Sequence, residues 1–162
     1  MAPADDAPEA AVKLDDLQRD ILLAQIQAFI EATSDPAARE PYLALKDAVE
    51  KSEVPADQQA RLGAIVEVAL SSGRVRRLFG PGAELSLNAL FQKTPRGRDI
   101  GNSIRELNAA LAKLKGQAIE EVSAALKSPG IYSLTLKTGE CQIVIRFEPA
   151  GVRIESLDVD LS

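Results

Sequence analysis

The spacing of apolar residues changes once along this 162-residue chain, and that change limits the fold more than any other feature. Before Gly130 apolar residues recur every three or four positions, which is the period of one helix face. Beyond Gly130 they recur every second position, which is typical of strands. The sequence therefore predicts an α+β fold: an N-terminal bundle of about three helices, then one or two helices packed on a C-terminal three-stranded antiparallel meander.

Proline and glycine positions divide the chain into four parts. We predict a flexible tail at 1–12, a helical subdomain at 13–79, a linker or strand at 80–98, and a helix followed by antiparallel sheet at 99–162. The tail consists mainly of Ala, Pro and acidic residues, so it has little to bury. Within the third part, residues 85–91 fit both a strand and a helix, because their apolar residues satisfy either period.

Capping signals mark the ends of the predicted helices. The second helix begins either at Pro36, with Asp35 as its N-cap, or at Pro41. The third ends at a glycine cap, Gly73, and a short helical turn follows at 75–79.

The C-terminal pattern is more varied. A further helical stretch is expected at 119–126, before the strands. In the last strand the apolar positions change phase near Ser156, which predicts either a β-bulge there or a crossing between two packing surfaces. Cys141, the only cysteine, lies on the apolar side of its strand, so we interpret it as a small core residue.

Five apolar residues in the 99–162 part follow a strict 4-3-4-3 spacing, which makes a narrow helical seam. They are Ile100, Ile104, Leu107, Leu111 and Leu114. The seam fits either a coiled-coil homodimer or packing on the chain's own sheet. Coiled coils usually need at least about three heptads and only two are present, which favours the sheet. These five residues are our interface candidates.

Charge is unevenly distributed around a net value of -5. Residues 1–70 hold 6 Lys and Arg against 14 Asp and Glu, whereas residues 71–115 hold 9 against 3. Six arginines in the basic segment are candidates for binding an anion, because guanidinium groups bind phosphates bidentately. They are Arg74, Arg76, Arg77, Arg96, Arg98 and Arg105. The alternative is that they face the acidic N-terminal helices of this chain or of a second copy.

The segment Pro95-Arg96-Gly97-Arg98 resembles the core of an AT-hook, whose extended Arg-Gly-Arg enters the minor groove of DNA. Asp99 stands where the hook has a second proline. The alternative interpretation is a linker that leads to the N-cap of the next helix.

The absence of histidine from the sequence limits the chemistry most. Without imidazole there is no usual general base and no usual ligand for zinc, and Cys141 has no base to activate it. We therefore predict no catalytic residues, no cofactor and no dedicated metal site. Glu155, Asp158 and Asp160 fit either a weak site for a hard cation or a solvated strand face.

These observations predict a non-catalytic interaction or scaffold module that self-associates, for example as a homodimer, or docks on a protein partner. The alternative function is binding of nucleic acid or another anionic ligand through the basic segment, 74–105. A single cysteine requires no oxidising compartment, and we expect a cytoplasmic protein without a membrane segment.

Overall fold

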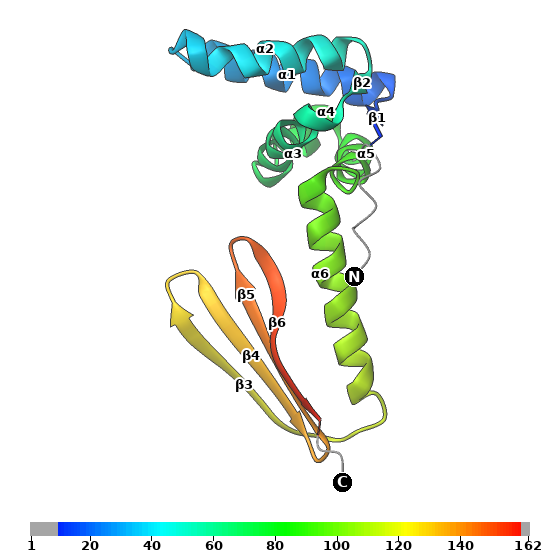
Figure 1. Ribbon diagram of the computed structural model, residues 1–162, viewed down its shortest axis with the longest axis vertical. Coiled ribbons are helices and arrows are strands. Elements are labelled where there is room, and N and C mark those ends of the chain that lie inside the picture. Colours follow the sequence, from blue (N-terminus) through cyan, green and yellow to red (C-terminus); the bar gives the residue numbers. More distant parts are fainter. Residues whose placement is uncertain (1–9, 160–162) are drawn as a thin grey trace, which may run out of the picture. The chain divides into compact units, whose positions relative to one another are not determined.

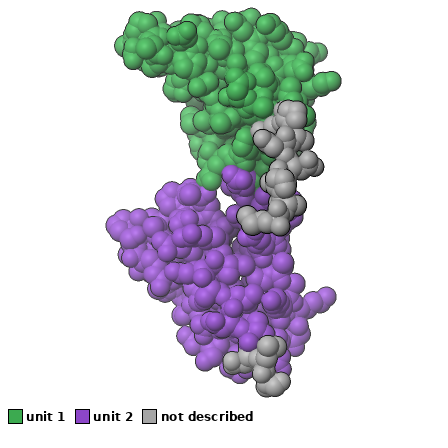
Figure 2. Space-filling view, viewed as in Figure 1, with its two compact units in different colours: residues 1–98 green, residues 99–162 purple. Residues whose placement is uncertain are grey.

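The computed structural model describes residues 10–159 and has an α+β architecture (Figure 1). Helices fill the first two thirds of the chain, and a four-stranded antiparallel sheet follows them. The chain divides into two compact units, residues 1–98 (unit 1) and residues 99–162 (unit 2), which are coloured separately in Figure 2. Each unit has a hydrophobic cluster of its own.

Unit 1 is helical apart from one pair of very short strands. Its elements are β1 (Val12–Lys13), α1 (Asp16–Ala32), α2 (Pro36–Glu50), β2 (Glu53–Val54), α3 (Ala56–Ser71), α4 (Arg74–Phe79), α5 (Pro81–Phe91) and the first turn of α6 (Pro95–Leu111).

The first strand corrects part of the predicted tail. Residues 1–9 lie outside the described residues, but Val12 is buried and pairs with Val54 of β2. The buried Gln59 side chain also donates to the Ala10 carbonyl at 2.9 Å. The chain is therefore fixed by backbone pairing and burial two residues before the predicted end of the tail.

Local capping explains where the helices begin and end. Asp15 and Gln18 form a capping box at the start of α1, and the Gln18 amide also donates to the Ser86 carbonyl of α5 at 3.2 Å. Helix α2 begins at Pro36 behind the Asp35 cap and continues through Pro41. Gly73 ends α3 in the left-handed conformation, with φ of 66°, as predicted.

The segment predicted as a linker or strand is mainly helix α5. Its buried residues are Ala83, Leu87 and Leu90, which follow helical spacing and join the core of unit 1. Leu85, which a strand would place on the same side as Leu87, is instead 71% exposed. Helical burial of three residues therefore resolves the ambiguity of the sequence.

Unit 2 contains the rest of α6 and an antiparallel sheet. Its other elements are the 3₁₀ turn η1 (Ala112–Leu114), β3 (Ile119–Ser128), β4 (Ile131–Thr138), β5 (Cys141–Glu148) and β6 (Gly151–Val159), and the strand order is β3-β4-β5-β6. The predicted helical stretch at 119–126 is wrong, because it is strand β3. The meander therefore has four strands and not three.

The predicted bulge in the last strand is confirmed. Val144 of β5 pairs with Ser156 of β6, but the next residue, Ile145, pairs with Ile154. Glu155 is thus the extra residue, next to the position that the phase change indicated.

Pairing across the sheet separates an apolar face from a polar face. One apolar row joins Val122, Leu136, Ile143 and Leu157 across the four strands. The parallel row at the other end joins Leu126, Tyr132, Phe147 and Val152. The opposite face carries rows such as Glu121, Lys137, Gln142 and Asp158. Such alternation lets one face of an antiparallel sheet pack on a helix while the other meets water.

No helix within residues 10–159 has the length and the apolar content that a bilayer-spanning segment needs.

Candidate interaction surface

The six candidate arginines are distributed over both units. Five belong to unit 1, and Arg105 belongs to unit 2. Three of them, Arg74, Arg76 and Arg77, are exposed on the six-residue helix α4.

The hydrogen bonds and ion pairs of these arginines are with their own chain. Arg76 Nη1 lies 3.6 Å from Glu84 Oε2, and Arg98 Nη1 donates to the Lys93 carbonyl at 2.7 Å. Arg105 donates to the Asn102 side chain. Nothing in these contacts gathers the guanidinium groups around one anion site.

The segment that resembles an AT-hook forms the first turn of α6, so it lacks the extended backbone that a minor-groove hook requires. Thr94 caps this turn: its Oγ1 accepts from Gly97 N at 3.2 Å and donates to the Phe91 carbonyl at 2.6 Å. The helix therefore starts at Pro95, inside the segment that the alternative interpretation assigned to a linker. A Cβ on Gly97 would lie 1.9 Å from the Phe91 carbonyl oxygen. Glycine here permits close approach of two helix ends.

The seam on α6 packs mainly on the sheet of unit 2. Leu107, Leu111 and Leu114 contact a buried cluster that consists of Ala110 on α6 and Cys141, Ile143 and Ile145 on β5. This packing confirms the expectation that the seam lies on the chain's own sheet. Ile100 is half-buried, and Ile104 remains 40% exposed.

Strand β3 is the most exposed regular element of unit 2. All ten of its residues are exposed. It lies at one edge of the sheet and pairs with a strand, β4, on one side only. Figure 1 shows β3 at the edge of the sheet away from β6. Its outer row of backbone N–H and C=O groups has no neighbouring strand in the sheet order, so it is able to accept another strand.

An apolar patch continues from β3 onto the sheet face. We call this patch the open face, and it consists of Val122, Leu126, Tyr132 and Phe147. Their exposed fractions are 59%, 65%, 53% and 41%. Contiguous exposed apolar side chains on one face are typical of a binding surface, whereas scattered single ones are not.

The opposite edge of the sheet differs in its side chains. Strand β6 has the bulge at Glu155, and that carboxylate lies 3.5 Å from Arg146 Nη1. Arg153 of the same strand lies 3.5 Å from Glu148 Oε1. A bulge and paired charges protect an edge from further pairing. The register of β3 with β4 also shifts, but near the ends of the strand, between Ile119 and Glu121 and between Leu126 and Ser128, and it is regular from Glu121 to Leu126.

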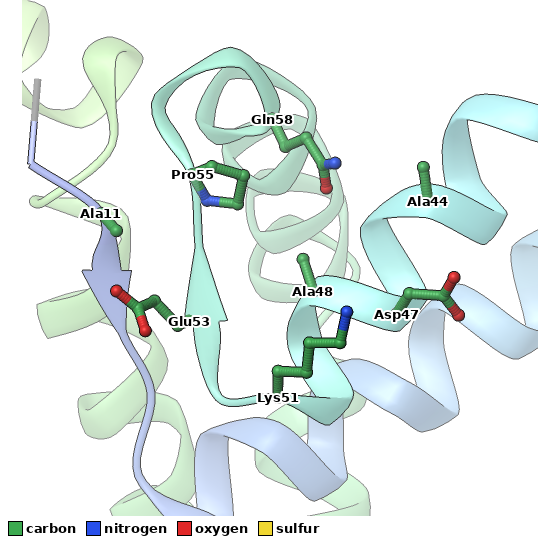
Figure 3. Close-up of a pocket in the computed structure, with 8 residues that line it drawn as sticks. All are labelled: Ala11, Ala44, Asp47, Ala48, Lys51, Glu53, Pro55 and Gln58. Carbon is green, nitrogen blue, oxygen red and sulfur yellow. The ribbon is translucent and has the colours of Figure 1, made fainter. Parts of the chain in front are cut away.

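A hollow of about 380 Å³ lies in unit 1 between α2 and the start of α3. Figure 3 shows small side chains of α2, Ala44 and Ala48, opposite Pro55 and Gln58. Lys51 is the one cationic residue among the eight that line it. The hollow therefore does not collect the candidate arginines.

Two of the three acidic candidates of the last strand, Glu155 and Asp158, lie within the described residues. Glu155 pairs with Arg146, and Asp160 lies outside the described residues. Asp158 lines a hollow of about 510 Å³ together with Glu120 and Lys137. Between residues 10 and 159 no group of three or more acidic or cysteine side chains is suited to hold a metal ion. Cys141 is buried, as predicted for a core residue.

The sequence analysis missed β3, although its signal is present. Val122, Ala124 and Leu126 alternate along the strand and lie on the apolar face, opposite Leu136, Leu134 and Tyr132.

Comparison with protein-family models, with curated protein sequences and with solved structures gives no significant match to this chain.

Proposed function

We propose that this chain is a non-catalytic interaction module that binds protein through β3 and the open face of unit 2. The observation that supports the proposal is the combination of an unpaired strand edge with an adjoining apolar patch. An added strand satisfies backbone groups at the edge, and its side chains cover apolar neighbours. Binding of this kind requires no reactive side chain.

The alternative function, binding of nucleic acid through 74–105, has less support. Steep counterion release needs several cations that contact phosphates together. The candidate arginines instead divide between the two units, and three of them, Arg76, Arg98 and Arg105, contact Glu84, Lys93 and Asn102 respectively.

Thiol labelling tests whether any protein covers the open face. Leu126→Cys introduces a reactive thiol on β3, while Cys141 is buried and reacts slowly. We expect maleimide to label this variant quickly in dilute purified protein and slowly in an extract of its native source. Leu85→Cys is the matched control, because Leu85 is 71% exposed on unit 1.

Equal labelling of both variants in the extract would overturn the proposal. Salt-dependent binding of duplex DNA by the purified chain, without protection at position 126, would favour the alternative function.

A further inference from the structure

The amino-acid sequence of β3 is self-complementary when two copies of the strand run antiparallel. With Ala124 opposite Ala124 of a second copy, Glu121 lies opposite Lys127, and the two-fold symmetry makes this pair twice. In the same register Val122 lies opposite Leu126, also twice. Opposite charges and apolar side chains that face each other directly across strands are the pairs that stabilise sheets.

The neighbouring registers do not place Glu121 opposite Lys127. A pairing centred on Ser123 places Lys127 opposite Ile119, and one centred on Ala125 places Lys127 opposite Ser123. A two-fold axis normal to the sheet keeps each side chain on its own face, so Glu121 remains on the polar face and Val122 and Leu126 on the apolar one, while Lys127 follows at the register shift after Leu126. The charge pattern therefore selects one register and one occupant, namely another copy of the same strand.

We propose that β3 pairs with β3 of a second copy of this chain, centred on Ala124, to form one sheet with four strands from each copy. The proposal rests on the proposed function and adds the identity of the partner and the register. Pairing satisfies the outer backbone groups of both strands, and each Val122 covers a flank of Leu126 on the other copy. The strand contains no proline or glycine, and its register with β4 is regular from Glu121 to Leu126.

A charge-reversal experiment tests the register without disturbing the core, because both charged residues are exposed. Lys127→Glu places Glu opposite Glu121, and Glu121→Lys places Lys opposite Lys127. We expect each variant alone to self-associate about tenfold or more weakly than the unaltered chain, since two attractive pairs become repulsive. An equimolar mixture of the two variants restores both attractive pairs, so it should associate as tightly as the unaltered chain in sedimentation equilibrium.

Lys115→Glu is the matched control, because it makes the same charge change on an exposed residue of unit 2 outside β3. It should leave the association unchanged. A general effect of net charge would instead weaken Lys115→Glu and Lys127→Glu equally, and that result would overturn the proposal.

Crosslinking provides a second readout. Ala124→Cys brings two thiols directly opposite each other across the two-fold axis, so mild oxidation should give a disulfide-linked dimer. Tyr132→Cys should not form one, whereas stacking of two open faces would crosslink Tyr132→Cys and would contradict pairing at the edge.

The outcomes separate this proposal from the proposed function. A chain that stays monomeric at high concentration contradicts pairing with a second copy, yet protection of position 126 in the extract would still support binding of another protein. Association that is insensitive to both charge reversals would show that the register is wrong.

Discussion

Unit 1 and unit 2 use apolar residues in different ways. Among the described residues, unit 1 buries 18 apolar residues in one cluster, to which seven elements contribute, although side chains such as Val68 and Leu85 stay exposed. In the described part of unit 2, four apolar residues are buried and eight more are partly buried around them, while Val122, Leu126, Tyr132 and Phe147 are exposed. The larger cluster gives unit 1 more packing within the chain. A sheet covered on part of one face retains apolar area that a binding partner can cover.

The two units also differ in how their backbone groups are satisfied. Capping residues occupy both kinds of helix end in unit 1: Asp15 and Asp35 precede helices, and Gly73 follows one. The backbone groups at these helix ends are therefore bonded locally. The sheet of unit 2 has two edges: the β6 edge has a bulge and ion pairs in its middle, whereas the register shifts of β3 fall near the two ends of that strand. Binding capacity is thus expected in unit 2 and stability in unit 1.

The largest expected difference between the units comes from leucine truncation. Leu62→Ala removes a fully buried side chain of unit 1 and should lower the free energy of unfolding by about 2–5 kcal/mol. Leu126→Ala removes a side chain that is 65% exposed, and in dilute solution it should cost less than about 0.5 kcal/mol. Urea unfolding followed by circular dichroism measures both. A similar loss of unfolding free energy in Leu62→Ala and Leu126→Ala would mean that the open face is covered within the chain.

Two glycines of α6 give a second comparison of packing in the two units. Gly97→Ala forces a methyl group against the Phe91 carbonyl and should cost about 1–3 kcal/mol. A Cβ on Gly101, in unit 2, meets no atom within 4 Å, so Gly101→Ala should stabilise the helix by about 0.5–1 kcal/mol. Thermal unfolding of the two variants gives the comparison, and a neutral Gly97→Ala would contradict the close helix contact.

A smaller effect is expected from two hydroxyl groups near the start of α6. Thr94→Val leaves the Gly97 N–H without its cap and should cost about 1 kcal/mol, because Thr94 is fully buried. Ser103→Ala removes only a bond to the Asp99 carbonyl four residues earlier, and it should change stability by less than about 0.5 kcal/mol. The midpoints of denaturant unfolding distinguish the two variants. Equal midpoints for Thr94→Val and Ser103→Ala would contradict the role of Thr94 as the cap of α6.

The smallest effects on stability are expected from surface ion pairs. Removing such pairs should destabilise the protein more in unit 2 than in unit 1. Arg76→Gln breaks one pair with Glu84 in which the arginine is 69% exposed, so we expect a loss below about 0.5 kcal/mol. Arg146→Gln breaks pairs with both Glu148 and Glu155 and should cost up to about 1 kcal/mol. Both losses should shrink in high salt, which urea titrations at two ionic strengths would show.

Helices α1 to α4 of unit 1 were predictable because their signals are local. Asp35-Pro36 and Gly73 act on the backbone next to them, and buried residues such as Leu22 and Ile26 repeat at helical spacing. The period of two identified β4, β5 and β6 for the same reason. In addition, the change of phase near Ser156 located a bulge that is visible in the pairing of β5 and β6.

Strand β3 was not predictable from period alone. Ile119, Val122, Ala125 and Leu126 suit a helix, while Val122, Ala124 and Leu126 suit a strand. The choice between them depends on β4, whose residues offer a backbone partner along almost the whole segment. Sheet pairing is non-local, so a local pattern with two solutions cannot select one. Because β3 was not predicted, the open face that includes its side chains was not predicted either.

The unequal edges of the sheet determine how far an assembly could grow. If two copies join at β3, both outer strands of the enlarged sheet are β6, where Glu155 interrupts the ladder and Arg146 and Arg153 occupy nearby carboxylates. The contact uses the same surface on each molecule, so it closes on itself. Such a chain would stop at two copies and would not polymerise into a fibre.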